Sequence, residues 1–402
     1  MSNRHFLGYP RERGLPGTRN LVAVIPSVFC ANVVARRIAG QVAGTVALCH
    51  PVGCSQVGWD LELTARALKG VGRHPNFYGV VVVGLGCERF RAEELAAAIA
   101  EAGKPVEVVI IQKEGDTLKA VEGGTRLAGR LVSEAARQSR QELPLSQLCL
   151  GLKCGGTDAT SGLAANPALG WVTDLLIEAG GAAIFTEVTE LLGAEDILAR
   201  RAVNRDVAEA IRTVIGNMEG RLRTATGWRE LQHRSALISP GNEDGGVTTV
   251  VEKALGGIYK AGSAPISGVL AYGQEVPGPG LYLLDCVGHD GEAVTGLVAS
   301  GCQVVVFTTG RGTPTGFPGV PVVKMTGNSA TFQRMQANID FNAGTIIEGA
   351  CLEEVGAELL EKVIRVASGE PTRAELGYHD ELFCITRDYT AGVSYITECG
   401  DI

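Results

Sequence analysis

Four potential metal ligands of this chain stand directly after apolar runs of the sequence. His50 and Cys54 lie four residues apart in HPVGCSQ, Cys87 follows VVVVGLG, and Cys154 ends CLGLKC. Because an imidazole and thiolates form a mixed nitrogen and sulfur donor set that suits iron or zinc, these four residues predict a metal site. The alternative is that they are core residues, since free cysteine often packs as a small apolar side chain.

Charged and amide side chains follow other apolar runs. Glu187 follows AAIFT, Gln112 ends VEVVIIQ, and Asp158 lies in the loop CGGTD. A carboxylate at the end of a buried strand is a candidate metal ligand or base, because its surroundings shift its pKa. Lys260 in YKAGS and Asn242 in SPGNEDGG are compatible with the same site.

A further loop, FTTGRGTPTG, combines a guanidinium group with glycines and hydroxyls. Arg311 and Thr309 in this loop predict an anion-binding site, because guanidinium and hydroxyl groups donate hydrogen bonds to anions. The alternative is an ordinary turn with a solvated arginine.

Several common motifs are excluded. The string GLGCER has Arg89 where a dinucleotide-binding fingerprint needs its third glycine, and no segment matches the phosphate-binding pattern GxxxxGK[ST]. No pair of cysteines has the CxxC spacing of a zinc finger or zinc ribbon. Seven other cysteines are expected to pack in the core: Cys49, Cys149, Cys286, Cys302, Cys351, Cys384 and Cys399.

The elements that must position these residues alternate along the chain. Short apolar runs at 21–25, 45–50, 80–86 and 106–112 predict strands, and amphipathic segments between them predict helices. Strands that are apolar throughout and alternate with helices indicate a parallel sheet covered on both faces. Since ligands bind beyond the carboxyl ends of such strands, the residues described above are expected to meet at one edge.

The same alternation resumes after the polar segment RQSRQELP, which ends at residue 144. We expect an α/β protein with two parallel-sheet, Rossmann-like units, a first domain at 1–144 and a second at 145–402. Strands are predicted at 148–152, 182–188, 281–287, 303–310 and 321–325, and helices at 169–178, 194–218, 248–255, 331–338 and 353–367. Residues 220–280 lack a clear period and predict a loop-rich insertion over the site.

Composition narrows the class of protein. The 402 residues carry 36 Lys plus Arg against 44 Asp plus Glu, a net charge of −8 without a basic block, which argues against nucleic-acid binding. The N-terminal residues lack the apolar core of a secretory signal, and no apolar run reaches the roughly 20 residues of a membrane span. Eleven cysteines without a dense framework favour a reducing compartment, so we expect a cytoplasmic protein.

Taken together, the strings resemble the large catalytic portion of the altronate and galactarate dehydratase family, which includes the large subunit of sulfolactate sulfo-lyase. The resemblance covers nearly the whole chain. It rests on the ordered strings GYPRERGLPGTRN, PSVFCAN, HPVGCSQ, RHPN, GLGCE, LKCGGTDATSGLAANPALG, TEVTELLGAE, SPGNEDGGVTTVVEKALG, KAGS, FTTGRGTPTG and IDFNAG.

The resemblance implies a lyase that eliminates water or sulfite from a 2-hydroxy acid, with ferrous iron or another divalent metal as cofactor. Elimination needs a base, a general acid and stabilisation of the enolate. On this reading Glu187, Lys260 and Asp158 transfer protons, while His50, Cys54, Cys87 and Cys154 hold the metal, with His50 as an alternative acid. Substrate contacts are expected from Arg19, Gln112, Arg311, Thr309 and Asn242.

Two alternative functions remain open, and the resemblance also implies partner chains. The cysteines could hold an iron–sulfur cluster with one open iron, or the chain could be a non-catalytic acid-binding protein. In the family a small SAF-type domain precedes the large portion, whereas here the string GYPRERG begins at residue 8. We therefore expect a separate small SAF-type subunit, and a larger oligomer. Phe29, His289 and Asp290 depart from the family strings and could reshape the pocket.

Overall fold

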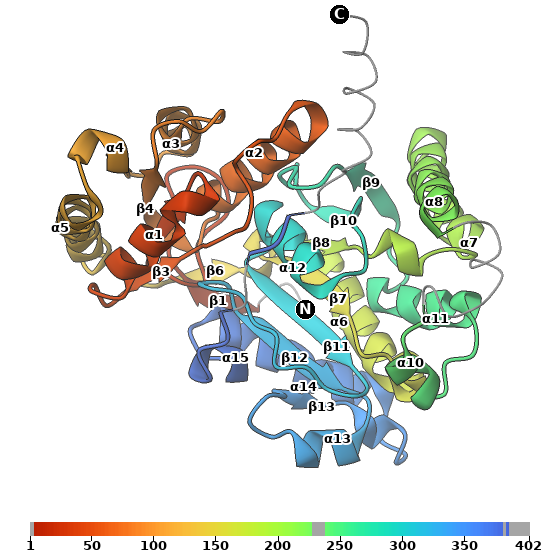
Figure 1. Cartoon of the computed structure of the whole chain (residues 1–402). Coiled ribbons are helices and arrows are strands. Elements are labelled where there is room, and N and C mark those ends of the chain that lie inside the picture. The colour runs from red at the N-terminus through yellow and green to blue at the C-terminus, as the bar shows by residue number, and fades with distance from the viewer. Residues whose placement is uncertain (1–3, 227–237, 381–382, 386–402) are drawn as a thin grey trace, which may run out of the picture.

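The computed structural model describes residues 4–226, 238–380 and 383–385. In this part of the chain two parallel sheets, of four and seven strands, are flanked by helices, as the alternation in the sequence predicts. Figure 1 shows the first sheet and its helices in red and orange and the second in yellow through blue. The α/β class is therefore confirmed, whereas the division at 144/145 stays a prediction.

The four-stranded sheet has the order β3, β2, β4, β5, and every neighbouring pair is parallel. Its helices α1 and α5 share one apolar cluster with the sheet, and α2 and α3 share another with its opposite face. The strands are β3 (Thr45–Ala47), β2 (Leu21–Pro26), β4 (Phe77–Gly84) and β5 (Val106–Ile110), and the helices are α1 (Asn32–Ala39), α2 (Gly58–Arg73), α3 (Ala92–Ala100) and α5 (Thr117–Ala135).

The seven-stranded sheet is parallel throughout. Its order is β13 (Phe341–Asn342), β12 (Val322–Thr326), β11 (Val304–Thr309), β7 (Cys149–Cys154), β8 (Ala182–Phe185), β10 (Gly280–Leu284) and β9 (Ile266–Leu270). From β7 the chain first builds the side of β8, and later crosses to add β11 on the other side. The order therefore reverses between β7 and β11, where ligands bind in open α/β sheets.

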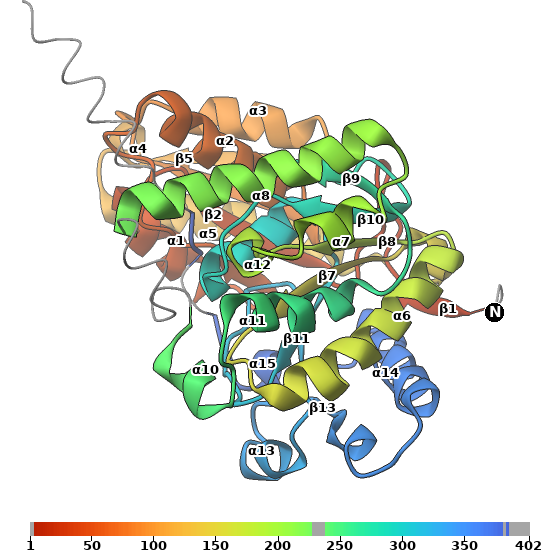
Figure 2. The same cartoon turned by 90° about the vertical axis from the view of Figure 1, so that its right-hand side faces the viewer.

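One face of this sheet is covered by α6 (Asn166–Glu178), α8 (Arg205–Thr226) and α14 (Leu352–Ala367). Figure 2 shows α6 running below the sheet and α8 across its upper part. The opposite face carries α12 (Asp290–Ala299), which packs against α2 of the first unit. Side chains of both sheets, α2 and α12 form one continuous apolar cluster, so the two units share a core.

Differences from the sequence interpretation concentrate in residues 220–280. This stretch was expected to be rich in loops apart from one helix at 248–255, which the structure confirms as α11 (Val250–Gly257). Its described part also contains α10 (Pro240–Asp244) and strand β9, which were not expected. β9 is an edge strand that pairs along its length with β10, and its first residue, Ile266, also forms an isolated bridge to Ala202. Only its two end residues are buried. The helix expected at 194–218 is divided into α7 (Glu195–Ala199) and α8.

Smaller elements complete the fold. β1 (His5–Gly8) pairs antiparallel with β6 (Gln141–Pro144), which places the N-terminal segment beside the polar boundary segment. Short helices are α4 (Ile111–Glu114), α13 (Ser329–Arg334) and α15 (Arg373–Leu376). Among the described helices, none combines the length and hydrophobicity that crossing a membrane requires.

Candidate active site

Two buried ammonium groups and one buried carboxylate form the centre of the site, which we call the lysine–glutamate centre: Lys153, Glu187 and Lys260. Lys260 Nζ donates to Glu187 Oε2 over 2.6 Å, and Lys153 Nζ donates to Glu187 Oε1. The side chains of all three residues are at most 1% exposed. Since a buried ion must be paired and hydrogen-bonded, each oxygen of the carboxylate balances one ammonium group.

The backbone of Glu187 is unusual for a residue with a side chain. It has φ 78° and ψ 52°, in the left-handed region, directly after β8 and before the short helix Val188–Glu190. Such a conformation costs about 1–3 kcal/mol in a non-glycine residue and is found most often at functional sites. It turns the carboxylate toward β7, where the Cys154 amide donates to Oε2 over 2.9 Å.

The opposite charges of the centre stabilise the ionised forms of all three side chains. Burial lowers the pKa of Lys153, but the carboxylates of Glu187 and Asp290 outweigh burial and raise it overall. The pKa of Lys260 is likewise raised, because Glu187 outweighs the effect of burial. Burial raises the pKa of Glu187, yet the two ammonium groups outweigh it and lower the pKa. At neutral pH the centre therefore holds two ammonium ions and one carboxylate.

A second layer of charged groups connects this centre with the surface. Asp290 Oδ1 lies 2.9 Å from Lys153 Nζ, and its side chain is 40% exposed. Glu190 Oε1 lies 2.8 Å from Lys253 Nζ, and Lys253 Nζ also donates to Asn242 Oδ1 over 3.3 Å. Burial, followed by the charge of Glu187, raises the pKa of Glu190. A carboxyl group with a raised pKa is suited to accepting and returning protons near neutral pH.

The loops after β7 and β11 adjoin one another at the edge of the sheet. Gly310 and Arg311 donate from their backbone amides to the Gly156 oxygen over 3.1 and 3.0 Å. A Cβ at Gly310 would stand 2.0 Å from the Asp158 carboxyl carbon, so this approach requires glycine. The Arg311 side chain is 47% exposed, 3.8 Å from Asp244. A guanidinium group is thus available to an anion at this edge.

Several expected site residues have their polar groups occupied within these loops. Asp158 Oδ1 accepts from Thr160 Oγ1 over 2.6 Å and from the Ser161 amide over 3.0 Å, which caps the following helical turn. Thr309 Oγ1 accepts from the Gly312 amide over 2.9 Å. Asn242 Nδ2 donates to the backbone oxygen of Thr157 over 3.0 Å. These contacts shape the loops, and none of them is a bond to the lysine–glutamate centre.

The four predicted metal ligands do not come together. Cys54 and Cys87 are exposed, whereas His50 and Cys154 are buried. Both ring nitrogens of His50 contact the backbone: Nε2 lies 2.6 Å from the Pro26 oxygen, and Nδ1 accepts from the Val52 amide over 3.3 Å. Within residues 4–226, 238–380 and 383–385, no three of the four place ligand atoms within 4.8 Å of one another.

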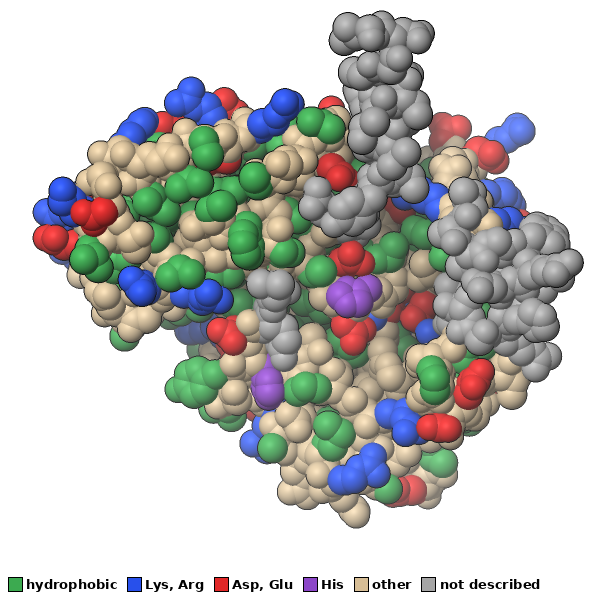
Figure 3. Space-filling model, in the orientation of Figure 1, with side chains coloured by type: hydrophobic (Ala, Val, Ile, Leu, Met, Phe, Trp, Pro, Cys, Tyr) green, Lys and Arg blue, Asp and Glu red, His purple; other side chains and the backbone are tan. Residues whose placement is uncertain are grey.

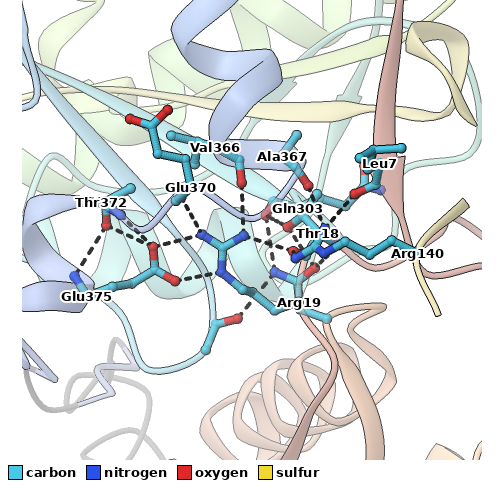
Figure 4. A network of polar contacts seen from close by, with 12 residues as sticks. Leu7, Thr18, Arg19, Arg140, Gln303, Val366, Ala367, Glu370, Thr372 and Glu375 are labelled. Carbon is cyan, nitrogen blue, oxygen red and sulfur yellow. Dashed lines mark hydrogen bonds and ion pairs between the residues drawn. The ribbon is translucent and has the colours of Figure 1, made fainter. Parts of the chain in front are cut away.

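Arg19 and Gln112 also lie apart from the centre. Arg19 precedes β2, at the amino end of the first sheet, and forms a bidentate pair with Glu375 over 2.7 and 2.9 Å. Its other bonds go to the backbone oxygens of Thr18, Val366 and Glu370 (Figure 4). As placed, Arg19 joins the N-terminal segment to the region of α14 and α15. Gln112 is the second residue of α4, after β5, and packs against Gly86.

Three residues of the site escaped the sequence interpretation: Lys153, Glu190 and Lys253. Lys153 had a usable signal, because it is a charged residue within the otherwise apolar strand CLGLKC. Such a residue must find a charged partner when it is buried. Glu190 and Lys253 had no comparable signal, since short polar segments carry many solvated charges.

A cavity of about 720 Å³ lies elsewhere in the described structure. Its walls include Leu148, Ala182 and Gly301, which stand at the amino ends of β7, β8 and β11. The charged centre is at the carboxyl ends of the same sheet. We place the candidate active site at the charged centre, because catalysis needs groups that can stabilise charge and transfer protons.

Two models of one protein family match nearly the whole chain. Residues 8–136 match the second domain of D-galactarate dehydratase/altronate hydrolase, and residues 145–391 match the C-terminal domain of D-galactarate/altronate dehydratase.

Three curated relatives are similar over most of their own length. Altronate dehydratase of Bacillus subtilis is 39% identical, covering 94% of this chain and 77% of the relative. The (2R)-sulfolactate sulfo-lyase subunit beta of Chromohalobacter salexigens is 36% identical, covering 97% and 99%. Galactarate dehydratase (L-threo-forming) of Escherichia coli is 36% identical, covering 94% and 76%. The chain therefore belongs to the D-galactarate/altronate dehydratase family and is an enzyme of the lyase class.

Proposed function

We propose that the protein eliminates water or sulfite from a small 2-hydroxy acid and releases a 2-keto acid. The observation that carries this proposal is the lysine–glutamate centre, because it concentrates buried positive charge at the carboxyl edge of the sheet. The family and the names of the relatives support the reaction class.

The reaction needs a proton acceptor and a site for negative charge. A base removes the proton on C2, the electron pair forms the C2–C3 double bond, and the bond from C3 to the leaving group breaks. The leaving group departs as sulfite, or as water once an acid has protonated it. The enol then takes up a proton at C3 to give the 2-keto acid.

We assign the stabilisation of the enolate to Lys153 and Lys260. Removal of the C2 proton places a second negative charge on the acid, and preorganised positive charge in a dry site lowers the barrier to that step. Both lysines are held protonated by Glu187, so neither is a base in the resting protein. The sequence suggested Lys260 for proton transfer, but its raised pKa makes it a poor proton donor, so we assign it to the stabilisation of charge.

Glu190 is our choice for the proton acceptor. Its pKa is raised by burial and by Glu187, and Lys253 orients it over 2.8 Å. Glu187 itself is a poorer base, since two ammonium groups lower its pKa. The exposed guanidinium of Arg311 is the candidate for binding the distal anion of the acid.

A requirement for ferrous iron or another divalent metal is a proposal that rests on the family alone. The four ligands expected from the sequence do not fit a common site in the described structure, so no step is assigned to a metal. The proposal predicts that chelation abolishes turnover and that added ferrous iron restores it. Charge-transfer absorption and acid-labile sulfide in active protein would instead favour the iron–sulfur alternative.

We also propose a separate small subunit as partner. The relative from Chromohalobacter salexigens is named a beta subunit, and it matches this chain over 99% of its own length. A partner that covers the carboxyl edge would exclude water and strengthen the electrostatic contacts.

The test is an anaerobic assay of altronate, galactarate and sulfolactate with the chain alone and with its co-expressed small partner. Keto acid and sulfite are measured separately, which identifies the leaving group. Keto acid from one acid, abolished by Glu190→Gln, would support the proposal. Binding of these acids without turnover by the complete complex would favour the acid-binding alternative. Full activity of the large chain alone would contradict the need for a partner.

A further inference from the structure

We infer that His289, Glu292 and Cys384 form a binding site for a borderline divalent cation such as ferrous iron or zinc. One imidazole nitrogen, one carboxylate oxygen and the thiol sulfur lie within 4.8 Å of one another. The space-filling view in Figure 3 shows a histidine side chain flanked by acidic side chains near the middle of the face. None of these three donors belongs to the ligand set expected from the sequence, although the ring of His50 lies 5.8 Å from the ring of Phe383, the neighbour of Cys384.

The donor set selects the class of metal. A nitrogen, an oxygen and a sulfur ligand together favour zinc or iron over magnesium or calcium, which prefer oxygen ligands alone. Three protein ligands leave a fourth position open, as in zinc sites that bind water or substrate.

Two elements hold the ligands in place before any metal binds. His289 precedes α12, and Glu292 lies in its first turn. The Tyr272 hydroxyl lies 2.8 Å from the backbone oxygen of Glu292 and 3.1 Å from the backbone oxygen of Cys384. It thus ties the backbones of two ligands together. Preorganisation of this kind reduces the ordering cost of binding.

The segment that carries the thiol is itself anchored. Phe383 and Ile385 are 2% and 4% exposed, so the residues on both sides of Cys384 are in the core. The Cys384 amide donates to Thr295 Oγ1 over 3.1 Å, and Thr295 belongs to α12. The thiol is therefore fixed against the helix that supplies the other two ligands.

The charges of the site call for a cation. Glu292 has a side chain only 18% exposed, and its one ion-pair contact in the described chain is with His289, over 3.7 Å. The Glu292 carboxylate places a negative charge beside the Cys384 thiol, within 4.8 Å. A bound divalent cation would offset that charge and stabilise the thiolate, releasing its proton.

The position of the site is adjacent to the lysine–glutamate centre. His289 lies between Gly288, whose oxygen accepts from Lys153 Nζ over 3.2 Å, and Asp290, which pairs with the same Nζ. Metal binding is argued from the donors and does not depend on the proposed function. A role for the metal in turnover would rest on that proposed function.

The experiment uses the full chain, freed of metal by chelation and kept reduced, and titrated with cobalt(II). We expect thiolate-to-cobalt charge-transfer absorption that saturates at one equivalent attributable to Cys384. Cys384→Ser should lose this component, and His289→Gln and Glu292→Gln should weaken binding by about tenfold or more. The variants should keep the melting temperature of the metal-free chain, and only the wild type should gain stability with cobalt.

Cys351 supplies the matched control, because its thiol also lies beside a carboxylate: it is exposed and donates to Glu353 Oε2 over 2.8 Å, whereas Cys384 is half-buried. Cys351→Ser should leave the cobalt spectrum unchanged. An unchanged spectrum in folded Cys384→Ser, or equal losses in the two serine variants, would overturn the inference. Since absorption and melting report binding directly, a protein inactive on every acid would still test it.

Discussion

At the residue scale, the exchange of one buried carboxylate for an amide tests the lysine–glutamate centre. Glu187→Gln leaves two buried ammonium groups without their shared counter-ion. Breaking a buried ion pair by removing one partner costs about 3–5 kcal/mol. We expect a loss of that size in the unfolding free energy, measured by urea denaturation, together with loss of turnover.

The control for Glu187 is an exposed pair. Asp196 lies 3.0 Å from Arg212, with side chains 71% and 45% exposed. Asp196→Asn should cost less than about 1 kcal/mol. If Glu187→Gln costs no more than this control, the buried lysines must be neutral and the assignment of charges is wrong.

His50 predicts how stability depends on pH. Burial lowers its pKa from 6.5 to about 4 in the folded chain, so the unfolded chain binds more protons between these values. Its contribution is therefore present above pH 6.5 and lost as pH falls toward 4, by about 3 kcal/mol. In His50→Gln the unfolding free energy should depend less steeply on pH in this window, although His74 still contributes. An unchanged slope would show that His50 is protonated in the folded chain, as a histidine with a nearby anion would be.

Residue types at strand ends predicted part of the site. Glu187 and Lys260 do meet, because the end of an apolar strand and the short helix Ile258–Ala261 before β9 reach the same edge. His50 and the cysteines share the same kind of sequence position, but their fate depends on side-chain direction. His50 turns into the core, where the backbone binds both nitrogens. The spacing of residues along the sequence does not predict the direction of a side chain at the end of a strand.

At the scale of elements, the loops after β7 and β11 can approach each other only because Gly310 has no side chain. Gly310→Ala would place a methyl group 2.0 Å from the Asp158 carboxyl carbon, and the two loops would have to separate. We expect at least a tenfold loss of turnover, because a small displacement of catalytic geometry has large effects. Steady-state kinetics of the folded variant measure it.

Gly216 provides the comparison for Gly310. It lies within α8 and a Cβ there would meet nothing within 4 Å. Gly216→Ala should stabilise the protein by about 0.5–1 kcal/mol, because alanine loses less backbone entropy in a helix. Full activity in Gly310→Ala would mean that the contact between the loops is dispensable.

Apolar runs predicted the nine strands that build most of both sheets, because a strand buried on both faces needs an unbroken apolar run. β9 escaped since it is an edge strand, and only Ile266 and Leu270 of its five residues are buried. Helix α8 was expected to begin earlier, but a turn at 200–204 interrupts the amphipathic pattern. The charged loops could be located only after the sheet order was known.

At the scale of the whole molecule, the shared core joins two sheets that follow each other in sequence. α2 of the first unit packs on α12 of the second, and their side chains belong to one apolar cluster. A divided core would unfold in two steps, whereas a shared one favours a single transition. We expect coincident denaturation curves from circular dichroism and from tryptophan fluorescence. Two separate transitions would show that the units are stable independently.

Arg19 gives a sharper test of how the two units are joined. Arg19→Lys keeps the charge but loses the bidentate contact with Glu375 and bonds to three backbone oxygens (Figure 4). A hydrogen bond to a charged group contributes about 1.5–3 kcal/mol, so we expect the unfolding free energy to fall by about that amount. KM for the acid substrate should not change. The exposed Arg365, 2.8 Å from Glu370, is the control, and Arg365→Lys should leave both quantities unchanged. A raised KM with unchanged stability in Arg19→Lys would instead restore Arg19 to the substrate site that the sequence suggested.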